Sequence, residues 1–395
     1  MHRSRGGRNR GGARRVSGEG PKVAAFVSPH GFGHAARSSA VMLEAQRQGG
    51  ATFELFTTAP RWFFEESLTG GFRHVEVDVD VGFRQRSALH VDLSATVAAL
   101  ERALPFSKSV VARLARQVGD AGCEAVLCDI APLGIAVAEA AGLPSLLVEN
   151  FTWGWLYEGY REEAPRLAEL GAELDAWAAR ATVRIQATPA CAPDPSLESV
   201  EPIGRPPRLE RADARRALGV AEKAPLVVVT MGGHAEDLSF LPRLREMAGT
   251  HFLVTGAARS SSAANVHLYD NATPLYMPDV LRAADALVAK LGYGTVAEVW
   301  REGLPFAHVT RPGFREMVSL EAFVDGASSG FRMTGREFVD GDWIDRIPEL
   351  VAMPRRPHFG GGARRAAEIL LALVRSRESG EGPRQGGAIS PSTDR

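Results

Sequence analysis

Short apolar runs alternate with helix-like patterns along most of the chain, and this alternation constrains the fold more than any single motif. An apolar run followed by an amphipathic segment is typical of a βαβ unit, in which consecutive strands are parallel. The runs that we expect to form strands are Lys22–Ser28, Thr52–Thr57, His74–Val79, Glu124–Asp129, Ser145–Glu149, Thr182–Ala187, Leu226–Thr230, His251–Thr255, Val266–Tyr269, Leu287–Ala289 and Phe306–Val309. The sequence therefore predicts an α/β fold.

Helical patterns lie between these runs. They cover approximately Ala35–Gln48, Leu93–Val118, Leu133–Ala141, Leu156–Arg180, Glu236–Met247, Pro278–Ala284, Thr295–Glu302, Met317–Ala327, Arg336–Val351 and Ala363–Arg375. A proline-rich segment, Pro189–Arg208, divides the series into two halves. We expect two doubly wound, Rossmann-like domains that face each other across a cleft, at residues 22–197 and 198–358, and a C-terminal helix at 359–377. In such domains ligands bind at the carboxyl ends of the strands, so the cleft is the expected site.

The composition excludes several classes of protein. A net charge of −1 gives no electrostatic basis for binding nucleic acid. No apolar run approaches the roughly 20 residues of a membrane span, so we expect no stable membrane insertion. The three cysteines have no metal-ligand spacing, and their odd number argues against a disulfide framework, which favours a reduced, cytoplasmic protein. The basic, glycine-rich segment 1–21 and the tail 378–395 are expected to be disordered.

One glycine turn in the second half is especially informative. It follows the apolar run Ala286–Ala289 and opens an amphipathic segment. Its glycines let the backbone approach a ligand, and the free N–H groups of the following helix suit a phosphate. Glu298, one turn into this helix, either accepts from both ribose hydroxyls or is a surface carboxylate. The residues expected to contact the nucleotide here are Lys290, Gly292, Tyr293, Gly294, Thr295 and Glu298.

A second glycine turn opens the C-terminal half. Gly232, Gly233 and His234 follow an apolar run, at a strand end that suits the oxygens of a diphosphate. Arg208, at the end of the linker, is expected to add a bidentate phosphate contact, and Arg205 is the competing choice. Both arginines are equally compatible with a solvated linker.

A third turn, between the first strand and the first helix, carries two histidines beside glycines. A neutral imidazole is a suitable general base near pH 7, and a helix N-terminus disfavours the imidazolium form. His34 and His30 are therefore candidate bases, or one of them only caps the helix. The rest of the turn, Gly31, Phe32 and Gly33, is expected to contact the substrate that this base deprotonates.

Polar side chains also follow three other strands. Asp129 ends one of them and is a further catalytic candidate. Glu149 and Asn150 end the next, before an aromatic run that includes Trp153. We expect these three residues to contact the same substrate, although such aromatics are also typical of a core. Glu316 follows the strand Phe306–Val309 and either reaches sugar hydroxyls or lies on a surface helix.

Taken together, these motifs resemble the nucleotide-sugar glycosyltransferases of the GT-B fold. The similarity is greatest to the glycosyltransferase-like N-terminal half of the L-arabinokinases, and it covers about residues 22–330. Segments with counterparts in the same order are His30–Arg37, Asp129–Pro132, Glu149–Trp153 and Gly292–Glu298. The sequence contains no counterpart of the sugar-kinase half.

A more distant resemblance is to the peptidoglycan N-acetylglucosaminyltransferases. It implies that His34 matches the histidine of their N-terminal loop and that Glu298 matches their ribose-binding glutamate. Their sugar-contacting Gln and Asn pair is replaced around Glu316 and Leu320, and their apolar membrane-docking patch is not evident. The broad group also includes the cytosylglucuronate synthases of nucleoside-antibiotic pathways.

The resemblance implies an inverting transfer of a sugar from a UDP-sugar to a small soluble acceptor, with His34 taking the acceptor proton. The UDP-sugar is a co-substrate, and no cofactor or metal is expected, because Asp78-Val79-Asp80 lies away from the donor turns. Two alternatives remain: a nucleotide-sugar 2-epimerase and a non-catalytic nucleotide-sugar-binding protein. The expected partners are the donor and the acceptor, and a homodimer is compatible with the sequence.

Overall fold

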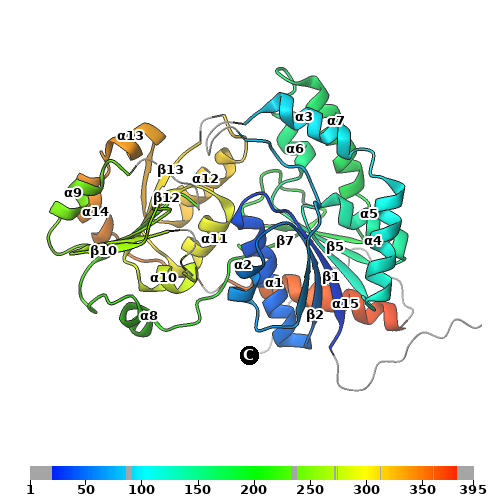
Figure 1. The fold of residues 1–395 in the computed structure, drawn as a ribbon, viewed down its shortest axis with the longest axis horizontal. Coiled ribbons are helices and arrows are strands. Elements are labelled where there is room, and N and C mark those ends of the chain that lie inside the picture. Colours follow the sequence, from blue (N-terminus) through cyan, green and yellow to red (C-terminus); the bar gives the residue numbers. More distant parts are fainter. Residues whose placement is uncertain are drawn as a thin grey trace, which may run out of the picture.

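A computed structural model describes residues 20–85, 91–232, 238–270, 273, 275–311, 313–358 and 360–379. Within these residues the chain forms two seven-stranded sheets, each with helices against it (Figure 1). The strands of the first sheet are β1 (Lys22–Val27), β2 (Thr52–Phe56), β3 (Phe72–Val75), β4 (Ala125–Asp129), β5 (Ser145–Glu149), β6 (Val183–Ala187) and β7 (Glu198–Val200). The helices of this half are α1 (Phe32–Gly49), α2 (Arg61–Ser67), α3 (Leu93–Ala103), α4 (Lys108–Asp120), α5 (Pro132–Ala141), α6 (Trp153–Glu158) and α7 (Pro165–Ala178).

The second half repeats this architecture. Its strands are β8 (Leu226–Thr230), β9 (His251–Thr255), β10 (Ser261–Ala263), β11 (Val266–Tyr269), β12 (Ala286–Lys290), β13 (Phe306–Val309) and β14 (Gly330–Met333). Its helical segments, and the last helix of the chain, are α8 (Arg211–Ala217), α9 (Leu241–Glu246), α10 (Met277–Ala283), α11 (Tyr293–Glu302), α12 (Met317–Ala327), α13 (Gly335–Asp340), η1 (Ile344–Arg346), α14 (Ile347–Ala352) and α15 (Gly362–Ser379).

The two sheets have the same doubly wound topology. Their strand orders are β3-β2-β1-β4-β5-β6-β7 and β10-β11-β9-β8-β12-β13-β14, with every pairing parallel except that of β10 with β11. The central strands are apolar and buried along their length because helices cover both faces. The predicted α/β class with two doubly wound sheets is confirmed.

Several predicted boundaries were wrong, for local reasons. The helix predicted at Leu93–Val118 is divided into α3 and α4, because Pro105 between them has no N–H to donate. The helix predicted at Leu156–Arg180 is also two helices, α6 and α7, and α7 begins at Pro165. The helix predicted at Arg336–Val351 ends early, at Gly341, whose φ of 75° is left-handed.

The division between the halves also differs from the prediction. The strand β7 lies after residue 197 but pairs with β6, so it completes the first sheet. The last helix, α15, packs against α1 rather than against the second sheet (Figure 1). The chain therefore passes between the halves twice, which ties them together at two places. None of the helices in the described residues is both long and apolar enough to cross a membrane.

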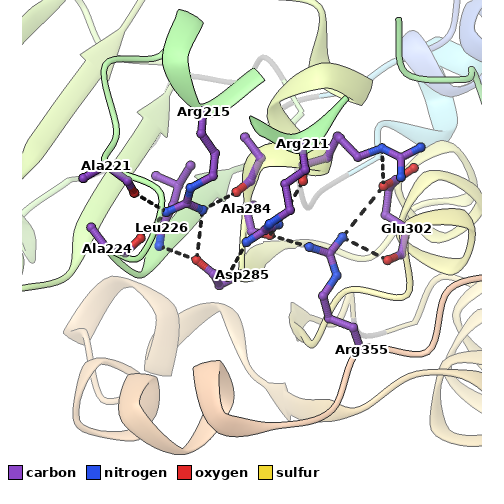
Figure 2. Close-up of polar contacts among 11 residues, drawn as sticks. Arg211, Arg215, Ala221, Ala224, Leu226, Ala284, Asp285, Glu302 and Arg355 are labelled. Atoms are coloured by element: carbon purple, nitrogen blue, oxygen red, sulfur yellow. Dashed lines mark hydrogen bonds and ion pairs between the residues drawn. The ribbon is translucent and has the colours of Figure 1, made fainter. Parts of the chain in front are cut away.

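A buried polar cluster anchors α8 to the second sheet, at the amino ends of β8 and β12 (Figure 2). Arg215 of α8 is 2% exposed. Its guanidinium donates to four groups, the backbone carbonyls of Ala221, Ala224 and Ala283 and the carboxylate of Asp285. Asp285 also accepts from the backbone N–H of Leu226 at 2.8 Å and from Arg211 at 2.5 Å.

The same cluster extends to the segment that leads into α15. Arg355 donates to the carbonyl of Ala284 at 2.9 Å and to that of Glu302 at 3.1 Å. The Glu302 carboxylate, which is buried, lies 3.2 Å from Arg282 and 3.8 Å from Arg355. These contacts lie at the opposite end of the strands from the glycine turns, so we assign them a structural role.

Replacing Arg215 tests this role. The Arg215→Ala substitution removes one donor from each of three carbonyls and one cation from Asp285, and we expect a loss of about 3 kcal/mol in the free energy of unfolding. The neighbouring Arg216 is exposed and pairs only with Asp213, so Arg216→Ala should change it by less than about 1 kcal/mol. Urea midpoints measure both values, and equal effects would contradict the assignment.

Candidate functional site

The glycine turns of the two halves line one cavity of about 600 Å³. The first half contributes the segment after β1 and residues that follow β5, and the second half contributes the segments after β8, β12 and β13. All of these segments follow the carboxyl ends of strands, which is where the sequence predicted a ligand site.

Two glycines bring the halves into backbone contact beside this cavity. Gly33 lies in the first turn of α1 and Gly294 in the first turn of α11. A Cβ on Gly294 would lie 2.9 Å from the Cα of Gly33, and one on Gly33 would lie 3.4 Å from the backbone nitrogen of Gly294. Because a Cβ at Gly294 does not fit at that distance, the close approach requires glycine there. The N-termini of two helices from different halves therefore meet at the cavity.

A histidine and a buried aspartate form a pair at the start of α1. The Nδ1 atom of His34 lies 2.9 Å from Asp129 Oδ1, at the end of β4. An ionised carboxylate only accepts hydrogen bonds, so Nδ1 carries a proton, and in the neutral form of the ring Nε2 is the acceptor. His34 lines the cavity, while Asp129 lies behind it and is 1% exposed. This arrangement is that of an oriented general base.

Arg37, one turn after His34, keeps Asp129 ionised. Its Nε donates to Asp129 Oδ2 at 2.8 Å and its Nη2 to Oδ1 at 2.6 Å, and Ser38 donates to Oδ2 at 3.1 Å. Burial alone would raise the pKa of Asp129, but the charge and hydrogen bonds of Arg37, with the contact to His34, lower it to about 2. Asp129 therefore holds a negative charge behind His34 at neutral pH.

The polar chain continues from Arg37 into the other half. Arg37 Nη1 donates to Asn150 Oδ1 at 2.6 Å, and Asn150 Nδ2 donates to Glu316 Oε1 at 3.0 Å. Burial raises the pKa of Glu316, against the hydrogen bond from Asn150 and the nearby cations. The Arg37 guanidinium also lies 5.0 Å from the ring centroid of Tyr293, at the start of α11. His34 is thus linked, through Asp129 and Arg37, to Glu316 and to Tyr293 of the second half.

His30 also lies beside a buried carboxylate, that of Asp80. Its Nε2 lies 3.1 Å from Asp80 Oδ1, and Trp153 Nε1 donates to Asp80 Oδ2 at 3.0 Å. The His30 and Trp153 rings meet edge to face, with centroids 5.7 Å apart. His30 is therefore fixed beside the cavity through a residue that the sequence analysis considered only as a metal ligand.

On the opposite side of the cavity, Glu298 pairs with Arg205. Arg205 Nε donates to Glu298 Oε1 at 3.0 Å, and both side chains are buried. The guanidinium lies between two aromatic rings, 4.3 Å from the centroid of Phe63 and 5.1 Å from that of Tyr276. Because Phe63 belongs to the first half and Tyr276 to the second, Arg205 joins the halves as well as the carboxylate.

Most of the predicted site residues line the cavity. They are His30, Gly31, Phe32, Gly33, His34, Asn150, Trp153, Gly232, Lys290, Gly292, Tyr293, Gly294, Thr295, Glu298 and Glu316. Gly233 and His234 lie outside the described residues. The specific roles predicted for these residues stay predictions, but the structure brings them together.

Two predicted contacts do not reach the cavity wall. Glu149 precedes Asn150 on an extended strand, so its side chain lies on the other face, where it accepts from Arg184 at 2.8 Å. Arg208 donates to Asp279 at 3.3 Å and stacks on Tyr276 at 3.8 Å, and Arg205 lines the cavity instead. Arg205, the competing choice, is therefore better placed than Arg208 to contact a phosphate in the cavity.

Arg37 and Asp80 were not predicted as site residues. The signal for Arg37 was its spacing of three from His34, which places both on one side of a helix. No local pattern identifies Asp80, because its partners His30 and Trp153 are distant in the sequence. No group of three or more His, Cys, Asp or Glu side chains within the described part of the chain could hold a metal ion.

The depressed pKa of Asp129 predicts a pH dependence of stability. Because its folded-state pKa of about 2 lies below its ordinary value of 3.8, the ionised group contributes stability that is full above about pH 5. This contribution is lost as the pH falls through about 2, so the gap in urea midpoint between the wild type and Asp129→Asn should narrow between pH 4 and pH 2. The exposed Asp120→Asn substitution is the control, and a constant gap for Asp129→Asn would contradict the assignment.

Comparisons with known proteins agree with this geometry. No known family profile matches the chain. The chain is 26% identical over 353 residues to L-arabinokinase of Arabidopsis thaliana, which covers 85% of this chain and 32% of that protein. It is also 26% identical over 215 residues to a UDP-N-acetylglucosamine--N-acetylmuramyl-(pentapeptide) pyrophosphoryl-undecaprenol N-acetylglucosamine transferase of Mycolicibacterium smegmatis, covering 47% of this chain and 56% of that protein.

The chain thus spans about a third and somewhat more than half of the lengths of these two relatives. Among solved structures, a UDP-glucosyltransferase from Polygonum tinctorium, in complex with 3,4-dichloroaniline, superposes with a TM-score of 0.58 at 14% identity, covering 91% of this chain and 100% of that chain. These relatives are the ones that the motifs resembled. The chain therefore has the GT-B fold, with two Rossmann-like halves that share one cavity.

Proposed function

We propose that the protein is a glycosyltransferase that moves a sugar from a UDP-sugar to a small soluble acceptor with inversion. One observation carries this proposal: the His34–Asp129 pair of one half and the glycine turn with Glu298 of the other line or adjoin the same cavity. A base facing a nucleotide-sugar site is the minimum that direct displacement at an anomeric carbon requires. The likeness to proteins with glycosyltransferase names supports the reaction class.

In the proposed reaction His34 acts at the acceptor. Its Nε2 takes the proton of the acceptor nucleophile while that atom forms a bond to the anomeric carbon and the bond from this carbon to the diphosphate oxygen breaks. Asp129, held ionised by Arg37, stabilises the imidazolium that forms. Attack from the side opposite the leaving group inverts the configuration.

The leaving diphosphate is stabilised at the other side of the cavity. The helix α11 begins at Tyr293, and its first backbone N–H groups have no partner within the helix. These groups and the positive end of the helix dipole suit the developing charge. In this proposal Arg205 adds a cation, and Glu298 of α11, which pairs with Arg205, accepts from the ribose hydroxyls.

Replacing His34 tests the assignment of the base. The His34→Ala substitution should lower turnover by about 10²- to 10⁴-fold, the usual contribution of a positioned general base. It should leave UDP affinity nearly unchanged, because the proposed donor contacts lie in the other half. Steady-state kinetics with labelled UDP-sugars and calorimetry with UDP measure the two effects.

His30→Ala is the matched control, since this histidine lines the same cavity and pairs with Asp80 rather than Asp129. If His30→Ala loses turnover while His34→Ala keeps it, His30 is the base. Conversion of the labelled UDP-sugar to its 2-epimer without any acceptor would show that the reaction is an epimerisation.

Turnover should not depend on a divalent metal. The proposal assigns the diphosphate charge to the helix terminus of α11 and to Arg205. Excess EDTA should therefore leave the rate of sugar transfer unchanged. Loss of activity with EDTA, restored by magnesium or manganese, would show that this account of the leaving group is wrong.

A further inference from the structure

One arginine of the cavity forms no ion pair with any carboxylate among the described residues. Arg311 follows β13, lines the cavity and is 8% exposed. Its Nε and Nη2 atoms are buried and form no hydrogen bond with any residue that the structure describes. The two other arginines that line the cavity differ in this respect, because Arg37 is bonded to Asp129 and Arg205 to Glu298.

Arg311 is held in place even though it is unpaired. Its guanidinium lies 4.3 Å from the ring centroid of Phe314, and the backbone N–H of Phe314 donates to the Arg311 carbonyl at 3.2 Å. The Phe314 ring packs against Phe83 of the first half, with centroids 6.0 Å apart. The cation is thus fixed on an aromatic surface inside the cavity and not extended into solvent.

A buried cation without a partner is costly, so its retention needs an explanation. Burial lowers the pKa of Arg311, which shows that its surroundings disfavour the charge. The charge of Glu316 favours the Arg311 cation, but the Glu316 carboxylate accepts from Asn150, and no ion pair joins it to Arg311 among the described residues. An anionic group of a ligand would satisfy the free N–H groups of Arg311.

The place of Arg311 in the sheet indicates which part of a ligand it meets. The strand β13 is the neighbour of β12, whose glycine turn we assign to the diphosphate. Arg311 lies on the side of Glu316, and Glu316 is linked through Asn150 and Arg37 to the base. In the proposed function, the part of the cavity beside Arg311 and Glu316 holds the transferred sugar, beyond the diphosphate. The planar fork of a guanidinium matches the two oxygens of a carboxylate.

We infer that the sugar transferred by this protein carries a carboxylate, as a uronic acid does, and that Arg311 binds it. The inference rests on the proposed function and adds the class of donor to it. It assigns to Arg311 a role in donor specificity, separate from the roles of His34 and of α11.

Calorimetry with UDP, UDP-glucose and UDP-glucuronate on the wild type, Arg311→Gln and Arg315→Gln tests the inference. Arg315 is the matched control, because it donates to the carbonyl of Trp155 and stacks on that ring, outside the cavity lining. We expect UDP to bind all three proteins alike. The wild type and Arg315→Gln should bind UDP-glucuronate about 10- to 100-fold more tightly than UDP-glucose, and Arg311→Gln should lose this preference.

A second readout shows whether the variant folds. Because Arg311→Gln removes an unpaired buried charge, its thermal midpoint without ligand should equal or exceed that of the wild type. A midpoint lowered by more than the loss of the contact with Phe314 explains would mean that Arg311 has a charged partner in the fold and would overturn the inference.

The outcomes separate this inference from the proposed function. If UDP binds but UDP-glucuronate has no advantage over UDP-glucose, the inference is wrong and the proposed function stands. If Arg311→Gln still prefers UDP-glucuronate, another residue binds the sugar carboxylate. If Arg311→Gln alone binds 4-hydroxybenzoate more weakly in the presence of UDP, Arg311 binds a carboxylate of the acceptor. Either result overturns the assignment. If UDP itself does not bind, the proposed function fails first.

Discussion

The backbone contact between Gly33 and Gly294 is the constraint on which the rest of the site depends. It lets the first turns of α1 and α11 meet without side chains between them. Because each helix starts at the carboxyl end of a central strand, the contact brings the functional edges of two separate sheets to one cavity. A Cβ at Gly294 would push the two helices apart, and it would change the distance between His34 and the glycine turn that precedes α11.

A continuous set of buried polar contacts crosses the same boundary. It runs from Asp129 through Arg37 and Asn150 to Glu316. Burying charged groups is costly unless every partner is present, so the network favours one relative placement of the halves. A ligand that meets Glu316 therefore acts on groups that also orient His34. Arg311 lies beside this network without a partner among the described residues, which is the pattern expected of a group kept for a ligand.

The sequence predicted the architecture well and the contacts less well. Alternating runs and glycine turns depend on local spacing, so the strands and the cavity-lining turns around His34 and Gly292 could be identified from the chain alone. Boundaries at prolines, such as the break at Pro105, were missed because apolar periodicity continues across them. The pairing of Arg205 with Glu298 could not be predicted, because the partners lie 93 residues apart and only the fold brings them together. Buried but unpaired groups have no sequence pattern at all, so Arg311 required the structure.

The central claim of the proposed function is that the nucleotide binds on the side of the cavity opposite His34, the general base. Calorimetric titration of UDP into the wild type, Glu298→Gln and His34→Ala tests this most directly. The account predicts that Glu298→Gln weakens UDP binding by about 10- to 100-fold, through loss of charge-assisted hydrogen bonds to the ribose, while His34→Ala leaves it unchanged. Thermal midpoints of the free proteins would establish that both variants are folded. Equal UDP affinity in Glu298→Gln and the wild type, or a loss confined to His34→Ala, would contradict it.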